Sequence, residues 1–93
     1  MSTLVQLEAI VHGRVQGVYF RTFVAHNATF LGLVGYARNM PDGITVKVEA
    51  QGNRDSLGKL VRLLEKGPPG AEVREVVVRW REPDRIFEGF EIK

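Results

Sequence analysis

The sequence contains no cysteine, which excludes disulfides, thiolate metal sites and a thiol nucleophile. Its only histidines, His12 and His26, lie far apart and have no further ligands at metal-site spacing. No apolar run approaches the roughly 20 residues that span a bilayer, and the first three residues show no basic-then-apolar leader. We therefore expect a cytoplasmic protein that needs no metal and no cofactor and does not enter a membrane.

A strong excess of one charge is also missing, since 13 basic residues face 11 acidic ones and the formal net charge is +2. The signs alternate along residues 79–85 instead of forming the basic stripe with exposed aromatics that is typical of nucleic-acid binding. A small anionic ligand held by one well-placed cation fits this charge as well as a polyanion does. We expect a small-molecule ligand, no nucleic acid, and a monomer.

What is present is the composition of a globular domain, with 44% hydrophobic and 26% charged residues. A chain of 93 residues corresponds to one domain with one modest core, so we assign residues 1–93 to a single domain. Along the chain, segments in which every second residue is apolar take turns with segments in which apolar residues recur at helical spacing. They predict a strand over 4–11, a helix over 19–31, strands over 33–39 and 44–50, a helix between Asn53 and Gly67, a strand over 76–81 and a short strand over 86–92.

The predicted order is β-α-β-β-α-β with a short extra strand at the C-terminal end. Two amphipathic helices bury their apolar stripes best on one face of an antiparallel sheet. The sequence therefore predicts an α+β fold, the ferredoxin-like split βαβ sandwich. Within it, Asn53 is expected to cap the second helix, and Trp80 is expected in the core because it alternates with Val76 and Val78.

The strongest chemical signal lies in residues 13–21, a predicted loop between the first strand and the first helix. Two glycines, Gly13 and Gly17, leave its backbone N–H groups free to converge on an anion. The start of the helix adds unpaired N–H groups and a positive dipole end. Arg21 is an unfavourable cation in that first turn, which suggests a ligand. A tight connection beside a solvated Arg21 explains the same residues, so both interpretations remain open here.

A second signal lies in residues 35–43, where a strand containing Gly35 runs into a Pro-Asp-Gly turn. A glycine inside a strand marks a close approach by other backbone or by a ligand. Asn39 stands at the junction, and its amide can hold a water molecule by one donated and one accepted hydrogen bond. The alternative is an amide that binds the backbone of its own turn, which is the commoner arrangement.

Together these two segments resemble the acylphosphatase family. The first signature is Gly13-Arg14-Val15-Gln16-Gly17-Val18-Tyr19-Phe20-Arg21, and the second is Gly35-Tyr36-Ala37-Arg38-Asn39 followed by Pro41-Asp42-Gly43. Residues 31–33, 67–70 and 89–92 are also similar to the family, so the resemblance covers nearly the whole chain. One departure stands out, because the stretch from Gly43 to Gly52 is one residue longer than usual. The alternation after it predicts that the extra residue lies in the turn or in a bulge beside it.

The resemblance implies an enzyme that hydrolyses the carboxyl–phosphate bond of acyl phosphates, with no metal or cofactor. It implies that Asn39 orients the attacking water and that Arg21 completes a phosphate cradle formed by the backbone of the preceding loop. The implied phosphate-binding residues are Val15, Gln16, Gly17, Val18, Tyr19, Phe20 and Arg21.

Three alternatives share this fold or this loop. They are an RNA-binding ferredoxin-like module, an acylphosphatase-like part of a larger enzyme, and a phosphate-ester hydrolase. The first lacks an aromatic stacking signature, and the third lacks a general acid or metal for an alkoxide leaving group. We expect a free-standing enzyme.

Overall fold

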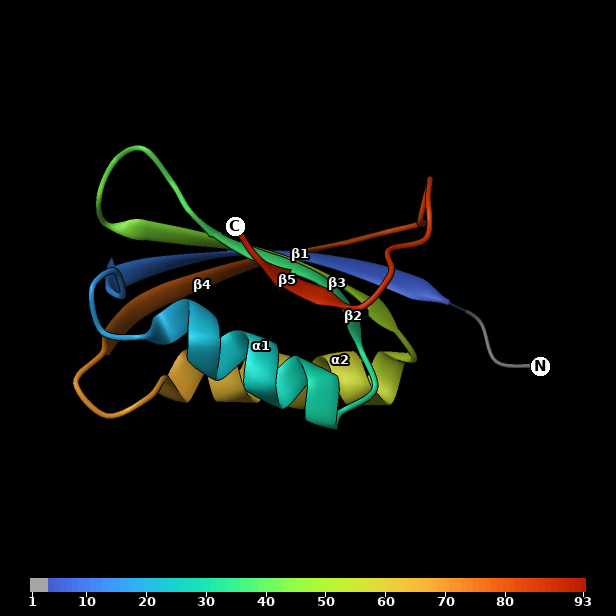
Figure 1. Cartoon of the computed structure of the whole chain (residues 1–93), viewed down its shortest axis with the longest axis horizontal. Helices are drawn as coiled ribbons and strands as arrows, with labels where there is room; N and C mark the ends of the chain where they lie inside the picture. The colour runs from blue at the N-terminus through green and yellow to red at the C-terminus, as the bar shows by residue number, and fades with distance from the viewer. Residues whose placement is uncertain (1–3) are drawn as a thin grey trace.

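The computed structural model describes residues 4–93 and shows a sheet with both helices on one face (Figure 1). This confirms the predicted ferredoxin-like sandwich. Residues 1–3, which begin the predicted domain and in which no leader was found, lie outside the described residues. The elements are β1 (Val5–Arg14), α1 (Phe20–Phe30), β2 (Val34–Asn39), β3 (Thr45–Gly52), α2 (Arg54–Lys66), β4 (Glu72–Arg81) and β5 (Phe90–Ile92).

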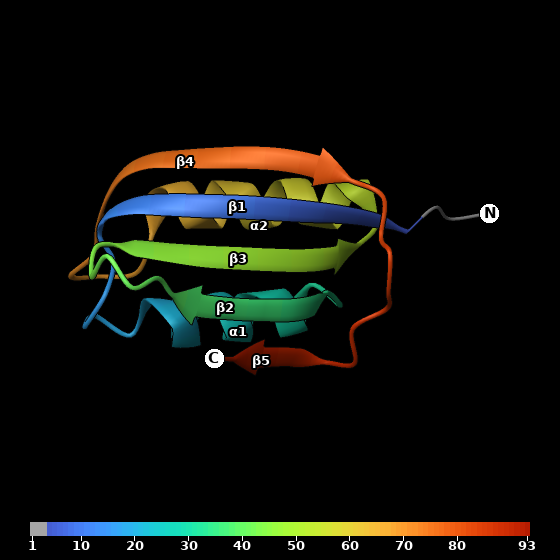
Figure 2. The same cartoon turned by 90° about the horizontal axis from the view of Figure 1, so that it is seen from above.

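The strands lie in the order β4-β1-β3-β2-β5 (Figure 2). The first four pair antiparallel, as predicted. The short β5 instead runs parallel to β2, with Gly35 opposite Phe90 and Ala37 opposite Ile92. The last strand therefore forms one edge of a mixed sheet and lies beside α1, the helix that follows the first loop.

The core lies between the helices and the inward face of the sheet. On the central strands, Leu7 pairs with Ala50 and Val11 with Val46, and all four side chains are fully buried. The helices contribute residues at i, i+4 and i+8 or at i, i+3 and i+7, which place them on one helical face. These buried residues are Phe20, Val24 and Ala28 of α1 and Leu57, Leu60 and Leu64 of α2.

The first strand is longer than predicted, because it continues through Gly13 and Arg14. These two residues pair with Val73 and Glu72 of β4 after a register shift at His12. A Cβ on Gly13 would lie 2.1 Å from the carbonyl oxygen of Glu72. This glycine is therefore required by close contact with β4, and the loop that we expected from Gly13 begins at Val15.

Three predictions about the C-terminal third need correction. The fourth strand begins at Glu72 instead of at Val76. Trp80 lies on the inward side, opposite Leu7, but β4 is an edge strand and the ring stays 39% exposed under the guanidinium of Arg54. It is therefore not a core residue. The last strand begins at Phe90 instead of at Ile86, whose side chain is exposed.

The turn between β2 and β3 accommodates the additional residue. The two strands keep one register from Asn39 opposite Val46 to Val34 opposite Gln51. Met40 N–H donates to the Thr45 carbonyl at 2.8 Å, which closes the turn. Ile44, expected to start the strand, belongs to this turn and is exposed. The extra residue therefore lies in the turn, one of the two predicted places, and Asn39 keeps its position at the end of β2.

Candidate active site

The loop between β1 and α1 is anchored at both ends and in its middle. Val15 and Phe20 are buried in the core. Between them, the Gln16 amide donates to the carbonyls of Met40 and Thr45, at 3.0 and 2.9 Å. This side chain ties the loop to the β2–β3 turn. The loop and Asn39 are therefore held next to each other before any ligand binds.

The backbone of this loop turns twice through left-handed conformations, at Gly17 (φ 76°) and at Tyr19 (φ 58°). Tyr19 is also the residue that precedes α1, and no side chain caps this helix. The Phe23 N–H donates to the Tyr19 carbonyl at 3.0 Å, so the N–H groups at the very start of α1 come before the first bond of the helix. Unpaired N–H groups at a helix start bind anions, since the helix dipole adds partial positive charge there.

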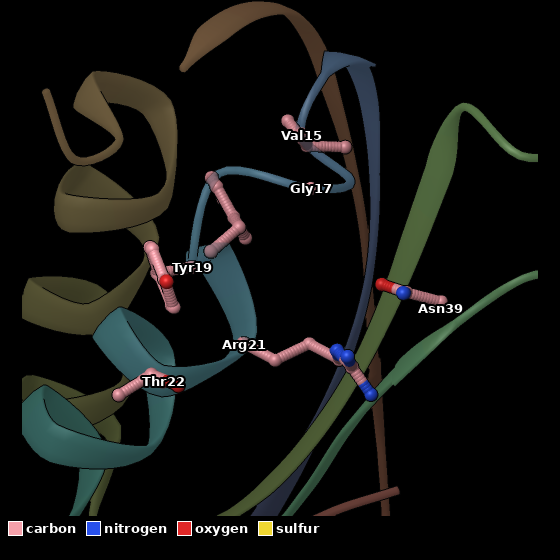
Figure 3. A pocket seen from close by; sticks show the side chains of 7 residues that line it. Val15, Gly17, Tyr19, Arg21, Thr22 and Asn39 are labelled. Atoms are coloured by element: carbon pink, nitrogen blue, oxygen red, sulfur yellow. The ribbon is translucent and has the colours of Figure 1, made fainter. Parts of the chain in front are cut away.

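Arg21 extends from the first turn of α1 across the loop toward Asn39 (Figure 3). Its Nη1 donates to the backbone carbonyl of Lys93 at 2.7 Å. Lys93 is itself held on the sheet, because its N–H donates to the carbonyl of Ala37 at 2.9 Å. One edge of the guanidinium is thus fixed by the chain after β5, and its other donors remain for a ligand.

Asn39 ends β2, and among the residues that the structure describes none forms a hydrogen bond with its side-chain amide. The turn is instead held by Asp42, which accepts hydrogen bonds from the N–H groups of Ile44 and Thr45 and from the Thr45 hydroxyl. The alternative that Asn39 binds its own turn is therefore wrong. Its amide is left available at the mouth of the loop.

Asp42 acts as the structural residue of this turn. The Thr45 hydroxyl bond, followed by the Ile44 N–H bond, lowers the pKa of the Asp42 carboxyl below its ordinary value. A carboxylate with a lowered pKa stabilises the fold above the pKa of the unfolded group and loses this contribution as the pH falls through the folded pKa. The turn that positions Asn39 is thus maintained at neutral pH.

These groups surround one cavity of about 310 Å³, within the size range of small-molecule sites. It is lined by Val15, Gly17, Tyr19, Phe20, Arg21, Thr22 and Asn39. Of the predicted phosphate-binding residues, the cavity thus includes all but Gln16 and Val18. Figure 3 shows Arg21 and Asn39 on facing elements of this cavity. Sequence reasoning did not single out Thr22, and it did not find that Gln16 crosslinks the loop to the turn.

Arg14 and the two histidines lie outside this cavity. Arg14 and His26 are exposed and do not line this cavity. His12 lies on β1, with Nδ1 3.4 Å from the Thr45 hydroxyl oxygen. Across residues 4–93, no three His, Asp or Glu side chains gather as a metal ion would require. Neither helix in that part of the chain is long and apolar enough to cross a membrane.

Comparison with known proteins identifies the family. A family model described as Acylphosphatase matches residues 7–92. The acylphosphatase of Dehalococcoides mccartyi is 48% identical over 87 residues, which cover 94% of this chain and 96% of that protein. The acylphosphatase of Caldivirga maquilingensis is 43% identical over 93 residues, covering 100% and 98%. The chain belongs to the acylphosphatase family, and this membership supports acylphosphatase function.

Solved structures agree on the fold. The crystal structure of acylphosphatase from Bacillus subtilis superposes with a TM-score of 0.91 at 34% identity, over 96% of this chain and 98% of that one. The same fold occurs inside a longer chain. The structure of HypF from T. kodakarensis matches 100% of this chain but only 12% of its own length, with a TM-score of 0.81 and 26% identity.

Proposed function

We propose that this chain hydrolyses acyl phosphates to a carboxylate and inorganic phosphate, with residues 15–20 and Arg21 holding the phosphate and Asn39 orienting the attacking water. One observation carries the proposal. The uncapped start of α1, Arg21 and the unbonded amide of Asn39 surround a single cavity. The Arg21 guanidinium offers two parallel donors, a geometric match to phosphate oxygens.

The leaving group explains why so few functional groups suffice. Hydrolysis breaks the bond between phosphorus and the carboxyl oxygen, and the carboxylate that departs has a conjugate acid of pKa about 4. It therefore needs no proton from a general acid. Phosphoryl transfer requires mainly positioning and stabilisation of charge on the phosphate oxygens. In our proposal the loop amides and Arg21 supply that stabilisation without a metal.

Asn39 has the second role. An amide can accept one hydrogen bond from the water and donate another, which fixes the direction of a lone pair. Water then adds to phosphorus as the carboxylate leaves from the opposite side, and the proton of the water passes to a phosphate oxygen. Asn39 itself neither gains nor loses a proton.

The test is hydrolysis of benzoyl phosphate with EDTA present, by the wild type and by Asn39→Ala, Arg21→Ala and Arg14→Ala. We expect wild-type turnover without metal. Removing one preorganised donor costs about 10² to 10³ in kcat, so Asn39→Ala should lose kcat and still bind phosphate. Arg21→Ala should lose both. Arg14→Ala is the matched control, because Arg14 is exposed and does not line the cavity.

Two outcomes would contradict this proposal. Folded wild type that binds phosphate without hydrolysing the substrate would be an anion-binding domain, as in a part of a larger enzyme. Turnover that EDTA abolishes and a divalent metal restores would overturn the metal-free mechanism.

A further inference from the structure

A second cavity, of about 480 Å³, adjoins the first along the outer side of α1. Thr22 lines both cavities, so the two meet at this residue. We call it the α1–β5 groove, lined by Thr22, Ala25, His26, Thr29, Phe30 and Ile92.

The two largest hydrophobic side chains that line the groove are Phe30 and Ile92. Phe30 is 85% exposed and Ile92 is 48% exposed, so neither large side chain is used by the core. Ala25 adds a methyl group to the lining, which includes no carboxylate, lysine or arginine. Exposed apolar surface beside a polar site is typical of a ligand-binding groove.

The groove has the length and direction of a short acyl chain. Its α1 residues recur at i, i+3, i+4, i+7 and i+8, which places them on one helical face. The nine helical residues from Thr22 to Phe30 are separated by eight rises of 1.5 Å and span about 12 Å. Ile92 on β5 forms the opposite wall. Such a trough accommodates a linear chain of several carbons lying along the helix.

The geometry of the reaction points the same way. In-line displacement places the leaving carboxylate on the side of phosphorus opposite the attacking water. In Figure 3, Asn39 lies to one side of the Arg21 guanidinium and Thr22 lies on the other, beside the body of α1. With water at Asn39, the acyl group leaves toward Thr22. That is where the α1–β5 groove begins.

We infer that the α1–β5 groove binds the acyl group of the substrate, so that this chain prefers acyl phosphates with apolar chains of several carbons over acetyl phosphate. The inference rests on the proposed function. The phosphate would occupy the first cavity, the carboxyl oxygen would lie near the Thr22 hydroxyl, and the chain would lie against Ala25, Phe30 and Ile92.

The experiment measures kcat/KM for acetyl, butanoyl and hexanoyl phosphate. Burying a full methylene corresponds to about a fourfold gain, so an open groove that buries half of each group gives about twofold per methylene. The wild type should therefore prefer hexanoyl over acetyl phosphate by about 16-fold. Phe30→Ser and Ala25→Gln should reduce this ratio to less than about threefold, with kcat/KM for acetyl phosphate unchanged.

Ile86→Ser is the control for Phe30→Ser, because Ile86 is also a large exposed hydrophobic residue but lies outside the groove. It should keep the full chain-length preference. Equal kcat/KM for acetyl and hexanoyl phosphate in the wild type would overturn the groove assignment and leave the proposed function standing. Absence of hydrolysis with every substrate, acetyl phosphate included, would overturn the proposed function and the inference with it.

Discussion

Arg21 carries two tasks at once, since it is held by the Lys93 carbonyl and is proposed to hold the phosphate. A planar guanidinium can serve both because its donors lie on different edges. In Arg21→Lys we expect phosphate affinity to fall by about tenfold or more, because an ammonium point charge cannot replace a bidentate fork. Inhibition by phosphate and kcat/KM for benzoyl phosphate measure this. Unchanged phosphate affinity would remove Arg21 from the cradle.

Gly17 tests the backbone of the loop separately from its side chains. A Cβ at this position meets no atom within 4 Å, but φ is +76°. Gly17→Ala should therefore cost only the left-handed strain, about 1–2 kcal/mol of unfolding free energy. If the loop relaxes to relieve the strain, its N–H groups turn away from the anion. We therefore expect phosphate affinity to fall in Gly17→Ala, although a stability loss of this size would not by itself weaken phosphate binding.

Gly70→Ala is the matched control for that experiment. It also has a positive φ and open space around it, but it does not line the cavity. It should lose similar stability and keep its phosphate affinity. Equal phosphate affinity in wild type and Gly17→Ala, measured by calorimetry, would show that the loop backbone does not hold the phosphate.

At the scale of elements, the two helices differ at their starts. Asn53 caps α2 by accepting from the Ser56 N–H at 2.8 Å, whereas α1 has no side-chain cap. Asn53→Ala should lower the free energy of unfolding by about 1 kcal/mol. Phosphate at 100 times its dissociation constant should raise that of the wild type by about 2.7 kcal/mol. The same rise is expected in Asn53→Ala, because the anion binds at the other helix.

Thermal unfolding with and without phosphate checks this additivity. A phosphate effect that disappears in Asn53→Ala would place the anion at α2. Arg21→Ala serves as the reference in which the phosphate effect should be absent while the Asn53 cap remains intact.

Periodicity predicted which residues are buried wherever burial depends only on the face of the residue's own strand or helix. The alternation of Val46, Val48 and Ala50 predicted one face of β3 correctly, and the spacing in α2 predicted its buried stripe. The prediction that Trp80 is buried was wrong, because its burial depends on whether another strand lies beyond β4, and β4 is an edge strand. Local pattern carries no information about that neighbour.

The candidate site shows the same division. The resemblance to the family implied that residues 15–21 and Asn39 form one site, and the cavity includes most of them. The Gln16 crosslink to Met40 and Thr45 joins residues 24 and 29 positions apart. The hydrogen bond from Arg21 to Lys93 joins residues 72 positions apart. Such partners follow from the folded topology and leave no trace in the spacing of the sequence.

At the scale of the whole molecule, the helix-free face of the sheet carries a buried polar network centred on Glu49. Glu49 accepts from the Tyr36 hydroxyl at 2.6 Å and from the Gln6 amide at 2.9 Å, and Arg81 lies 3.5 Å away. Burial first, and then the bond to Glu49, raise the pKa of Tyr36 to about 12. The folded state therefore favours the neutral phenol.

This network predicts a loss of stability in alkali. Unfolded tyrosine ionises near pH 10, so from there to the folded pKa of about 12 the unfolded state releases a proton that the folded state keeps. The contribution of Tyr36 is complete below pH 10 and disappears as the pH rises through this window. Tyr36→Phe should cost about 1.5 kcal/mol at pH 8, and its deficit should shrink at pH 11. Urea unfolding of both proteins measures it; a deficit that is constant with pH would contradict the assignment.

The hydrogen bond from Arg21 to Lys93 also has a consequence for the order of folding. It joins residues 72 positions apart, and β5 is an edge strand whose one neighbour in the sheet is β2. Closing long loops is entropically costly, so such contacts form late. Trp80 lies on β4 beside α2, so its fluorescence reports on the other side of the molecule. During refolding, recovery of catalytic activity should therefore lag behind recovery of Trp80 fluorescence, because activity requires β5 to dock and Lys93 to hold Arg21.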